Sequence, residues 1–441
     1  MKTSAHQLAL WLFALAALVP SAAHAQIVVY ADALYTMAGP GIRNGVVVIE
    51  DGRIAAVGPA SEIAVPNGYR VLRAAVVTPG LIDAHATVGL TGIFNQPHDQ
   101  DQIERSGPIQ PELRALDAYN TREQLIEWVR SFGVTTIHTG HAPGELISGQ
   151  TMVVKTVGNT VEAAMLVETA AIAATLGPGA RRSSGSPGTR GKMMSMLRSE
   201  LIKAQEYLDG REPKVEEDAE HPAEEDAADD VVADGADAAE PRTKAEHGVS
   251  QPRGSRNLRL EALARVLKRE LPLLITAHKS QDIASALRLA REFNIRIILD
   301  GAAEAYLLID EIRDAGVPVI IHPSMARMYG EMENASFETA VRLRTHGIQV
   351  AMQSGFEGYV PKTRVVLLET AVYVAHGLAF EDALAAMTRV PATMLGIIDR
   401  VGTLEVGKDA DLALYSGDPF EYTTHCIGVI INGEVVSEKA R

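Results

Sequence analysis

Short apolar segments of strand type alternate with amphipathic helical segments between residues 76 and 376. Such alternation is typical of parallel βα units, whose strands are covered by helices on both faces. The expected strands span residues 76–82, 135–138, 152–155, 273–277, 296–299, 317–321 and 349–352. The expected helices span residues 121–131, 161–176, 258–269, 283–293, 303–315, 337–345 and 363–376. The count approaches eight units, so we predict an α/β fold with a closed (β/α)8 barrel of the TIM type rather than a doubly wound sheet.

Both ends of the chain have a different, strand-rich pattern. Strands are expected at 27–30, 46–50 and 53–57 near the start, and at 411–415, 427–431 and 435–436 near the end. Asp51-Gly52 and Asn432-Gly433 are two-residue hairpin signals. Neither piece is large enough for a core of its own, so we expect residues 26–78 and 396–441 to form one composite β-sandwich domain. Residues 79–395 are then assigned to the barrel.

An acidic stretch interrupts the barrel pattern. Residues 215–240 contain twelve Asp or Glu and no Lys or Arg, and they account for most of the net charge of −15. A segment of this composition buries too little apolar area to order itself. We predict a flexible acidic insertion over residues 180–255, with a short helix at 193–208. A tolerated loop insertion is favoured over a tether or ion-binding tail, because long loops add little closure entropy.

The N-terminal 25 residues resemble a secretory signal peptide. An apolar run at residues 8–20 follows Lys2, and Ala23-His24-Ala25 fits a small-residue cleavage rule. We expect cleavage after Ala25 and a periplasmic or secreted protein without a stable membrane anchor; the alternative is an uncleaved N-terminal anchor. The single cysteine, Cys426, excludes a disulfide scaffold, and no basic stripe supports nucleic-acid binding.

Histidines gather at the ends of the expected strands. Six of them lie at or shortly after such ends: His85, His98, His138, His141, His278 and His322. Barrel enzymes place their chemistry at the C-terminal ends of the strands, and neutral imidazole nitrogen suits Zn²⁺ and similar divalent metals. The pattern therefore predicts a metal site at the barrel mouth, by which we mean this C-terminal end. The alternative for each histidine is a structural, hydrogen-bonded core residue.

Lys155 ends an apolar strand, where a buried cation needs a partner or a chemical modification. Carboxylation would turn it into a carbamate that bridges metal ions. The alternative is a lysine that reaches the barrel rim or pairs with a nearby acid.

Three motifs resemble those of one known family. Residues 77–85 read Val-Thr-Pro-Gly-Leu-Ile-Asp-Ala-His, residues 391–396 read Pro-Ala-Thr-Met-Leu-Gly, and residues 400–411 read Arg-Val-Gly-Thr-Leu-Glu-Val-Gly-Lys-Asp-Ala-Asp. Together they resemble the amidohydrolase superfamily, in particular its imidazolonepropionase-like and prolidase-like members, over nearly all of residues 26–441. The resemblance implies a metal-assisted barrel that hydrolyses C–N bonds.

The resemblance also implies ligands, and the chain matches them in part. His85 fits the first His of a His-x-His pair whose second position is Thr87, and Lys155 fits the carboxylated lysine. On the fifth strand the chain reads Thr276-Ala277-His278 where relatives read His-Ala-His. Gly301 occupies the position of the sixth-strand His, and Gly355 that of the eighth-strand catalytic Asp.

Two hypotheses follow from this partial match. In the first, a rebuilt site with divalent metal, Zn²⁺ above others, uses His85, Lys155, His278 and one of His138, His141 or His322, with Asp300, Glu304 or Glu357 as base. It hydrolyses a C–N bond of a small amide, dipeptide-type or cyclic ureide substrate. Tyr359, Lys362 and Arg364 are candidates for binding that substrate, Arg being the better two-pronged partner for a carboxylate; alternatively their loop caps the next helix. In the second hypothesis the barrel is non-catalytic and binds a ligand or partner. A homo-oligomer is compatible with either.

Overall fold

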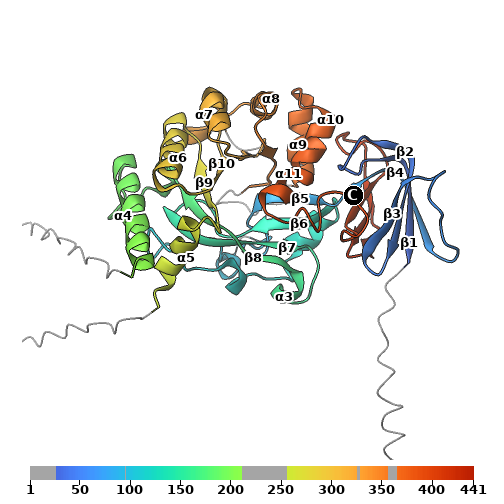
Figure 1. Ribbon diagram of the computed structural model, residues 1–441, viewed down its shortest axis with the longest axis horizontal. Helices are drawn as coiled ribbons and strands as arrows, with labels where there is room; N and C mark the ends of the chain where they lie inside the picture. The colour runs from blue at the N-terminus through green and yellow to red at the C-terminus, as the bar shows by residue number, and fades with distance from the viewer. Residues whose placement is uncertain (1–25, 95, 211–255, 325–327, 356–364) are drawn as a thin grey trace, which may run out of the picture.

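The computed structural model describes residues 26–94, 96–210, 256–324, 328–355 and 365–441 (Figure 1). The expected signal peptide, the acidic stretch 215–240 and four candidate site residues lie outside the described residues; these four are Glu357, Tyr359, Lys362 and Arg364.

Eight strands form the barrel, in the sheet order β12-β11-β10-β9-β8-β7-β6-β5. They are β5 (Leu81–Ala86), β6 (Val134–Thr139), β7 (Ile147–Lys155), β8 (Met165–Thr175), β9 (Leu273–Ala277), β10 (Ile297–Gly301), β11 (Val319–Ile321) and β12 (Val350–Ala351). The two edges meet through a parallel bridge between Ala86 and Gly355 and a 3.0 Å hydrogen bond from Ala84 N to Met352 O. The prediction of a closed barrel is confirmed.

One barrel strand runs against the others. β7 pairs antiparallel with both β6 and β8, whereas the remaining neighbouring strands pair in parallel. In the β6–β7 register Lys155 lies opposite Thr136, and Met152 lies opposite Thr139. The last residue of β7 therefore lies near the N-terminal start of β6 and away from the mouth.

The helix expected at residues 161–176 is wrong over most of its length. Only α3 (Val161–Ala164) is helical, and β8 follows it directly. An Ala-rich apolar segment satisfies the helical and the strand period almost equally well. Pairing of β8 with both β7 and β9 gives its backbone hydrogen bonds and decides the outcome.

Helices surround the barrel (Figure 1). They are α2 (Gln124–Arg130), α5 (Leu258–Leu267), α6 (Ser280–Phe293), α7 (Ile309–Asp314), α8 (Thr339–Thr345), α9 (Val366–Ala375), α10 (Phe380–Ala386) and α11 (Arg389–Met394). Single 3₁₀ turns are η1 (Pro97–Asp99), η2 (Ala115–Asp117), η3 (Pro178–Ala180), η4 (Ala305–Leu307) and η5 (Gly330–Met332). None of the helices in the described ranges is both long enough and apolar enough to cross a membrane.

The helix α4 (Arg190–Leu208) occupies part of the predicted flexible insertion. It buries Met193, Leu197, Leu201 and Ala204 on one face and packs against α5 and α6. The spacing of these residues places them on one helical stripe, and burial of that stripe orders the segment. The expected flexible insertion from residue 180 is therefore corrected over residues 190–208, which form α4 and pack against α5 and α6.

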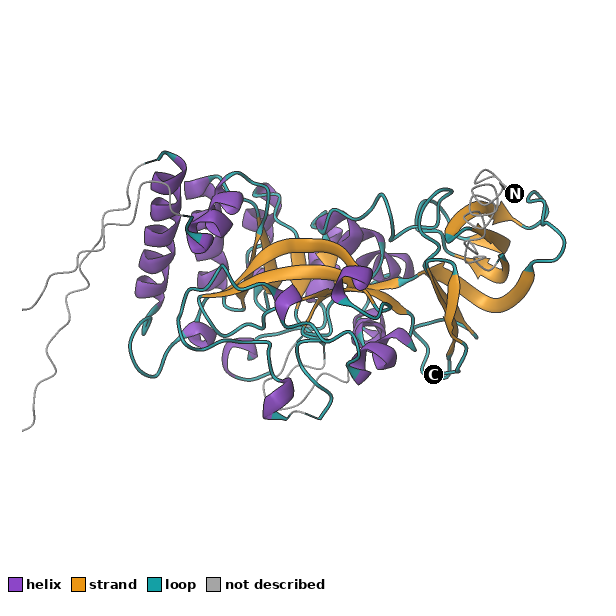
Figure 2. Ribbon diagram, turned by 90° about the horizontal axis from the view of Figure 1, so that it is seen from below, coloured by secondary structure: helices purple, strands orange, loops and turns teal. Residues whose placement is uncertain are grey.

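The two chain ends share a seven-stranded sheet in the order β15-β14-β13-β4-β1-β2-β3. Its strands are β1 (Ile27–Leu34), β2 (Ile42–Glu50), β3 (Arg53–Pro59), β4 (Arg70–Pro79), β13 (Leu412–Tyr415), β14 (Cys426–Ile431) and β15 (Glu434–Ser437). Antiparallel pairing of β4 with β13 joins the two ends, and residues of both ends share one buried core. Figure 2 shows this sheet at the opposite end of the molecule from the helix-covered barrel.

Candidate active site at the barrel mouth

Polar side chains from several strands converge at the barrel mouth. His85 lies on β5 and Asp300 on β10, while His322 directly follows β11 and Gln353 lies two residues after the end of β12. All four are buried. In a (β/α)8 barrel this end carries the chemistry, so the mouth is the candidate active site.

His85 and Asp300 form a buried pair. Asp300 Oδ1 lies 3.2 Å from His85 Nδ1 and accepts a 2.8 Å hydrogen bond from Gln353 Nε2, while Oδ2 accepts a 2.5 Å bond from Thr276 Oγ1. Burial by itself would lower the pKa of His85 and raise that of Asp300. The attraction between the two groups outweighs burial, so the pKa of His85 is raised and the pKa of Asp300 is lowered. Asp300 thus stabilises the protonated form that His85 takes when its ring accepts a proton.

A second carboxylate, Asp83, ties β5 to the segment after β12. Its Oδ2 accepts a 2.5 Å hydrogen bond from Ser354 Oγ, and its Oδ1 accepts bonds from Ser354 N at 3.0 Å and His85 N at 3.3 Å. Burial raises the pKa of Asp83 to about 6, although the bonds from Ser354 oppose the shift. Asp83 thereby fixes the backbone that carries His85.

His138 is a structural cross-link. Its ring centroid lies 5.7 Å from that of His85, but its Nδ1 is 2.7 Å from Ala84 O and its Nε2 is 2.7 Å from Thr151 Oγ1. Burial and the charge of His85 lower the pKa of His138 to about 3, so the ring is neutral. Both ring nitrogens are therefore already engaged, and the ring joins β5 to β7.

The other candidate histidines are divided between the mouth and the surface. His278 is half-buried and His322 and His141 are buried, and burial lowers the pKa of each, to about 4 for His278 and His141. His322 Nδ1 lies 3.0 Å from Pro323 O and 3.2 Å from the Tyr373 hydroxyl. His98 is exposed on η1.

Lys155 lies far from its expected place. Because β7 is antiparallel to its neighbours, Lys155 faces the terminal sheet rather than the mouth. Its Nζ lies 2.9 Å from Asp409 Oδ2 and 2.9 Å from Asp411 Oδ2, and it donates to Asn432 Oδ1 as well. The prediction of a carboxylated metal ligand is corrected, because Nζ is paired with two carboxylates, which would repel the negative charge of a carbamate.

Glu304 is held by structure and is not free to act as a base. It accepts hydrogen bonds from Lys279 Nζ at 3.0 Å, Asn334 Nδ2 at 2.7 Å and Ser280 N at 2.7 Å. Burial opposes its charge, but these bonds prevail and lower the pKa of Glu304 to about 2. Since Ser280 N is the first amide of α6, Glu304 caps that helix.

The donor set does not fit a divalent metal. Within the described ranges, no group of three or more His, Cys, Asp or Glu side chains is placed to hold an ion. The reasons are visible above: His138 uses both ring nitrogens, the His85 nitrogen Nδ1 faces Asp300, and Lys155 lies elsewhere. Zn²⁺ and a carbamate, both implied by the resemblance, are thus not supported by these side chains.

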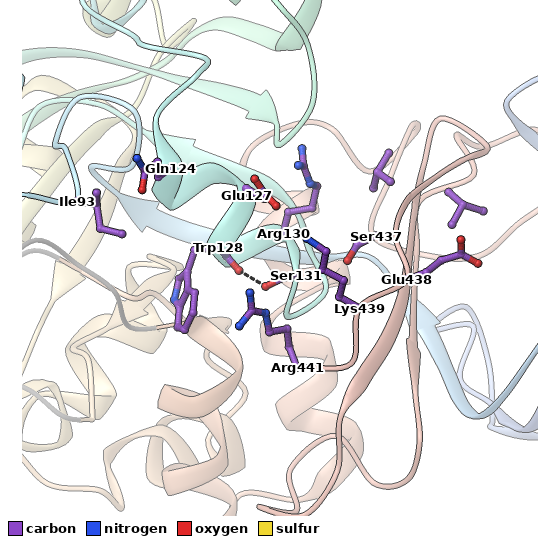
Figure 3. A pocket seen from close by; sticks show the side chains of 12 residues that line it. Ile93, Gln124, Glu127, Trp128, Arg130, Ser131, Ser437, Glu438, Lys439 and Arg441 are labelled. Atoms are coloured by element: carbon purple, nitrogen blue, oxygen red, sulfur yellow. Dashed lines mark hydrogen bonds between the residues drawn. The ribbon is translucent and has the colours of Figure 1, made fainter.

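The mouth encloses a small cavity of about 10 Å³, lined by His85, Ala86, Thr87, Pro143, Gln353 and Gly355. This is space for about one water molecule. A larger cavity of about 620 Å³ lies between α2 and β15, bordered by Trp128, Arg130 and Arg441 among others (Figure 3). No residue of the mouth lines that cavity, so the convergent polar groups, and not the cavity size, identify the candidate site.

Comparison with known proteins agrees with the fold. A model of the amidohydrolase family matches residues 109–437. The crystal structure of an amidohydrolase from Thermotoga maritima is similar with a TM-score of 0.79 at 23% identity, covering 94% of this chain and all of that one. An amidohydrolase from Hapsidospora irregularis is 23% identical over 418 residues, which are 88% of this chain and 39% of that protein. Imidazolonepropionase from Mesorhizobium japonicum is 38% identical over 73 residues, only 16% of this chain and 18% of the relative.

Proposed function

Because the chain belongs to the amidohydrolase family, we propose that it hydrolyses a C–N bond of a small amide, dipeptide-type or cyclic ureide substrate at the barrel mouth. The family match confirms the resemblance inferred from the sequence motifs. The observation that carries the proposal is the buried His85–Asp300 pair beside the mouth cavity. Metal dependence, which the resemblance adds, is not part of the proposal, because the described donors do not fit an ion.

The geometry suits proton transfer by His85. Asp300 accepts from Nδ1–H, and Nε2 has no hydrogen-bond partner of ordinary geometry among the described residues. In the proposed step, Nε2 takes a proton from a water molecule while the water oxygen bonds to the substrate carbonyl carbon. His85 then returns the proton to the leaving nitrogen as the C–N bond breaks. We assign the hydroxyl of Thr87, which lines the cavity, to a hydrogen bond with the carbonyl oxygen, and it keeps its proton throughout.

The test is amine or ammonia release from a panel of N-acetyl amino acid amides, Xaa-Pro dipeptides and hydantoins. We expect turnover of at least one class by the purified protein. General acid–base catalysis typically contributes about 10²–10⁴-fold, so His85→Asn should lower kcat by about 100-fold or more. His346→Asn, on an exposed side chain, is the matched control. Equal rates for His85→Asn and the control would refute the assignment.

A non-catalytic barrel is the second candidate. It is favoured by the mouth cavity, which has room for about one water molecule. It predicts that no compound of the panel is hydrolysed, while one or more of them raises the thermal midpoint by binding.

A further inference from the structure

At the barrel mouth, side chains bond to one another at the place where a metal centre would bond them to an ion. We infer that this mouth binds no divalent ion, and that a hydrogen-bonded network of His85, Asp300, Thr276 and Gln353 occupies the place of one. The inference deepens the proposed function and rests on it for its catalytic meaning. Its structural part rests on four positions: Thr87, Thr276 and Gly301, where the resemblance implies His ligands, and Gly355, where it implies the catalytic Asp.

Two of those positions carry threonines that are committed to hydrogen bonds. Thr276 Oγ1 donates to Asp300 Oδ2 at 2.5 Å. Thr87 Oγ1 accepts a 3.0 Å bond from Thr91 Oγ1. Both threonines are buried. A neutral hydroxyl is a much poorer ligand for Zn²⁺ than imidazole, so these positions support hydrogen bonding and not metal binding.

The other two positions are glycines whose side-chain space is already filled. A Cβ on Gly301 would lie 2.5 Å from His278 Cε1, and a Cβ on Gly355 would overlap Pro323 Cγ. The φ angles of Gly301 and Gly355, +74° and +68°, are also unfavourable for a residue with a side chain. Neither position could regain a His or Asp ligand unless its neighbour moved.

Of the remaining donors, Asp300 and His138 are engaged in hydrogen bonds, whereas His85 Nε2, His278 Nδ1 and His322 Nε2 have no hydrogen-bond partner among the described residues. Asp300 receives three hydrogen bonds, from an imidazole, an amide and a hydroxyl. His138 has one ring nitrogen on Ala84 O and the other on Thr151 Oγ1. An ion bound by Asp300 or His138 would have to break hydrogen bonds that satisfy these buried polar groups, which is unfavourable.

For catalysis, it follows that side chains perform the proton transfers and that no metal ion takes part. His85 moves the proton from water to the leaving nitrogen, and Asp300 keeps its charge throughout. Gln353 is a positioning residue: its Nε2 donates to Asp300 Oδ1 at 2.8 Å and to Ile321 O at 3.1 Å, which holds the carboxylate toward His85. No other reactant is required, since water supplies both the hydroxyl and the proton.

The test is metal content, which does not depend on knowing the substrate. The full chain, purified without chelator or metal-affinity resin, is incubated with Zn²⁺ and bicarbonate, desalted, and analysed by mass spectrometry for metal per chain. His85→Asn and His278→Asn serve as matched variants. We expect the native protein and each variant to differ by less than about 0.1 Zn²⁺ per chain. We also expect that adding Zn²⁺ does not shift the thermal midpoint of unfolding.

Each outcome decides the inference. Zn²⁺ bound equally to the native protein and both variants lies on the surface and supports the inference. Near-stoichiometric Zn²⁺ that is lost in either variant overturns it, even when the protein hydrolyses the amide panel. Absence of mouth-bound Zn²⁺ together with absence of turnover leaves the inference intact and refutes the proposed function instead. Hydrolysis should persist in EDTA. In Gln353→Leu, a fall in kcat that exceeds the change in KM supports the positioning role of Gln353, whereas an unchanged kcat contradicts it.

Discussion

The filled space beside Gly301 gives a prediction with a built-in control. Gly301→Ala places a Cβ 2.5 Å from His278 Cε1, in a backbone conformation with φ of +74°. Gly316, at the C-terminal end of α7, has a similar φ of +62°, but nothing lies within 4 Å of its added Cβ. Gly316→Ala therefore reports the backbone penalty alone, and the pair of variants separates that penalty from the steric clash.

The magnitudes follow from these two terms. A left-handed conformation costs a residue with a side chain about 1–2 kcal/mol, and an overpacked core site costs about 1–3 kcal/mol more. We expect Gly316→Ala to lose about 1–2 kcal/mol of unfolding free energy and Gly301→Ala about 2–5 kcal/mol, by urea denaturation followed by circular dichroism. Equal losses in the two variants would refute the claim that His278 fills the space of a lost ligand.

Three further predictions test the structural assignments. Lys155→Met should destabilise the protein by about 3–5 kcal/mol in urea, because it leaves Asp411 buried without its cation, although Asp409 keeps Arg400 at 2.7 Å; an unchanged midpoint would contradict the ion cluster. Glu304→Gln should cost about 1–3 kcal/mol at pH 7. Since the pKa of Glu304 is lowered to about 2, the contribution of its charge is present above the usual glutamate range near 4.5 and is lost as pH falls toward 2, so the two unfolding curves should converge on acidification. Burial raises the pKa of the Cys426 thiol to about 12, so iodoacetamide at pH 8 should label it only after unfolding, and rapid labelling of the native protein would show that it is accessible.

The sequence carried enough information for the architecture. Alternating apolar strands and amphipathic helices predicted the barrel, and the Asp51-Gly52 and Asn432-Gly433 turns marked hairpins that the structure contains. Their residues have the positive φ values that such turns require. These patterns depend only on residues close together in the sequence, so they can be recognised without knowing which strands are neighbours.

Strand direction could not be read from the sequence. A short apolar strand looks the same whether it runs parallel or antiparallel, so nothing in residues 147–155 indicated that β7 is reversed. The expected role of Lys155 depended on that direction, and its true partners, Asp409 and Asp411, lie more than 250 positions away in the chain. Partners this distant leave no local pattern.

The mouth was predicted in part. His85 and Asp300 were both named as candidates, one as a ligand and the other as a base, but their direct pairing was not foreseen. Asp83, Ser354 and Gln353 were missed as site residues, because a single polar residue after a strand has no distinctive spacing. Asp83 lies inside the recognisable 77–85 motif, which was the one available signal.

We also propose that the protein is exported after cleavage of its first 25 residues. The mature protein should begin at Gln26, and N-terminal sequencing of protein recovered from the periplasm or the medium would identify that residue. An intact Met1 would contradict cleavage and favour an uncleaved N-terminal anchor.

The most direct test of the central claim is a double-mutant cycle on C–N hydrolysis by His85→Asn, Asp300→Asn and the double variant. If the two side chains act as one unit, each single variant should lose about 100-fold or more in kcat/KM, and the double variant should lose no more than the worse single one. Losses that multiply in the double variant would show that the two residues act independently. Full activity in either single variant would place the chemistry elsewhere and contradict the account.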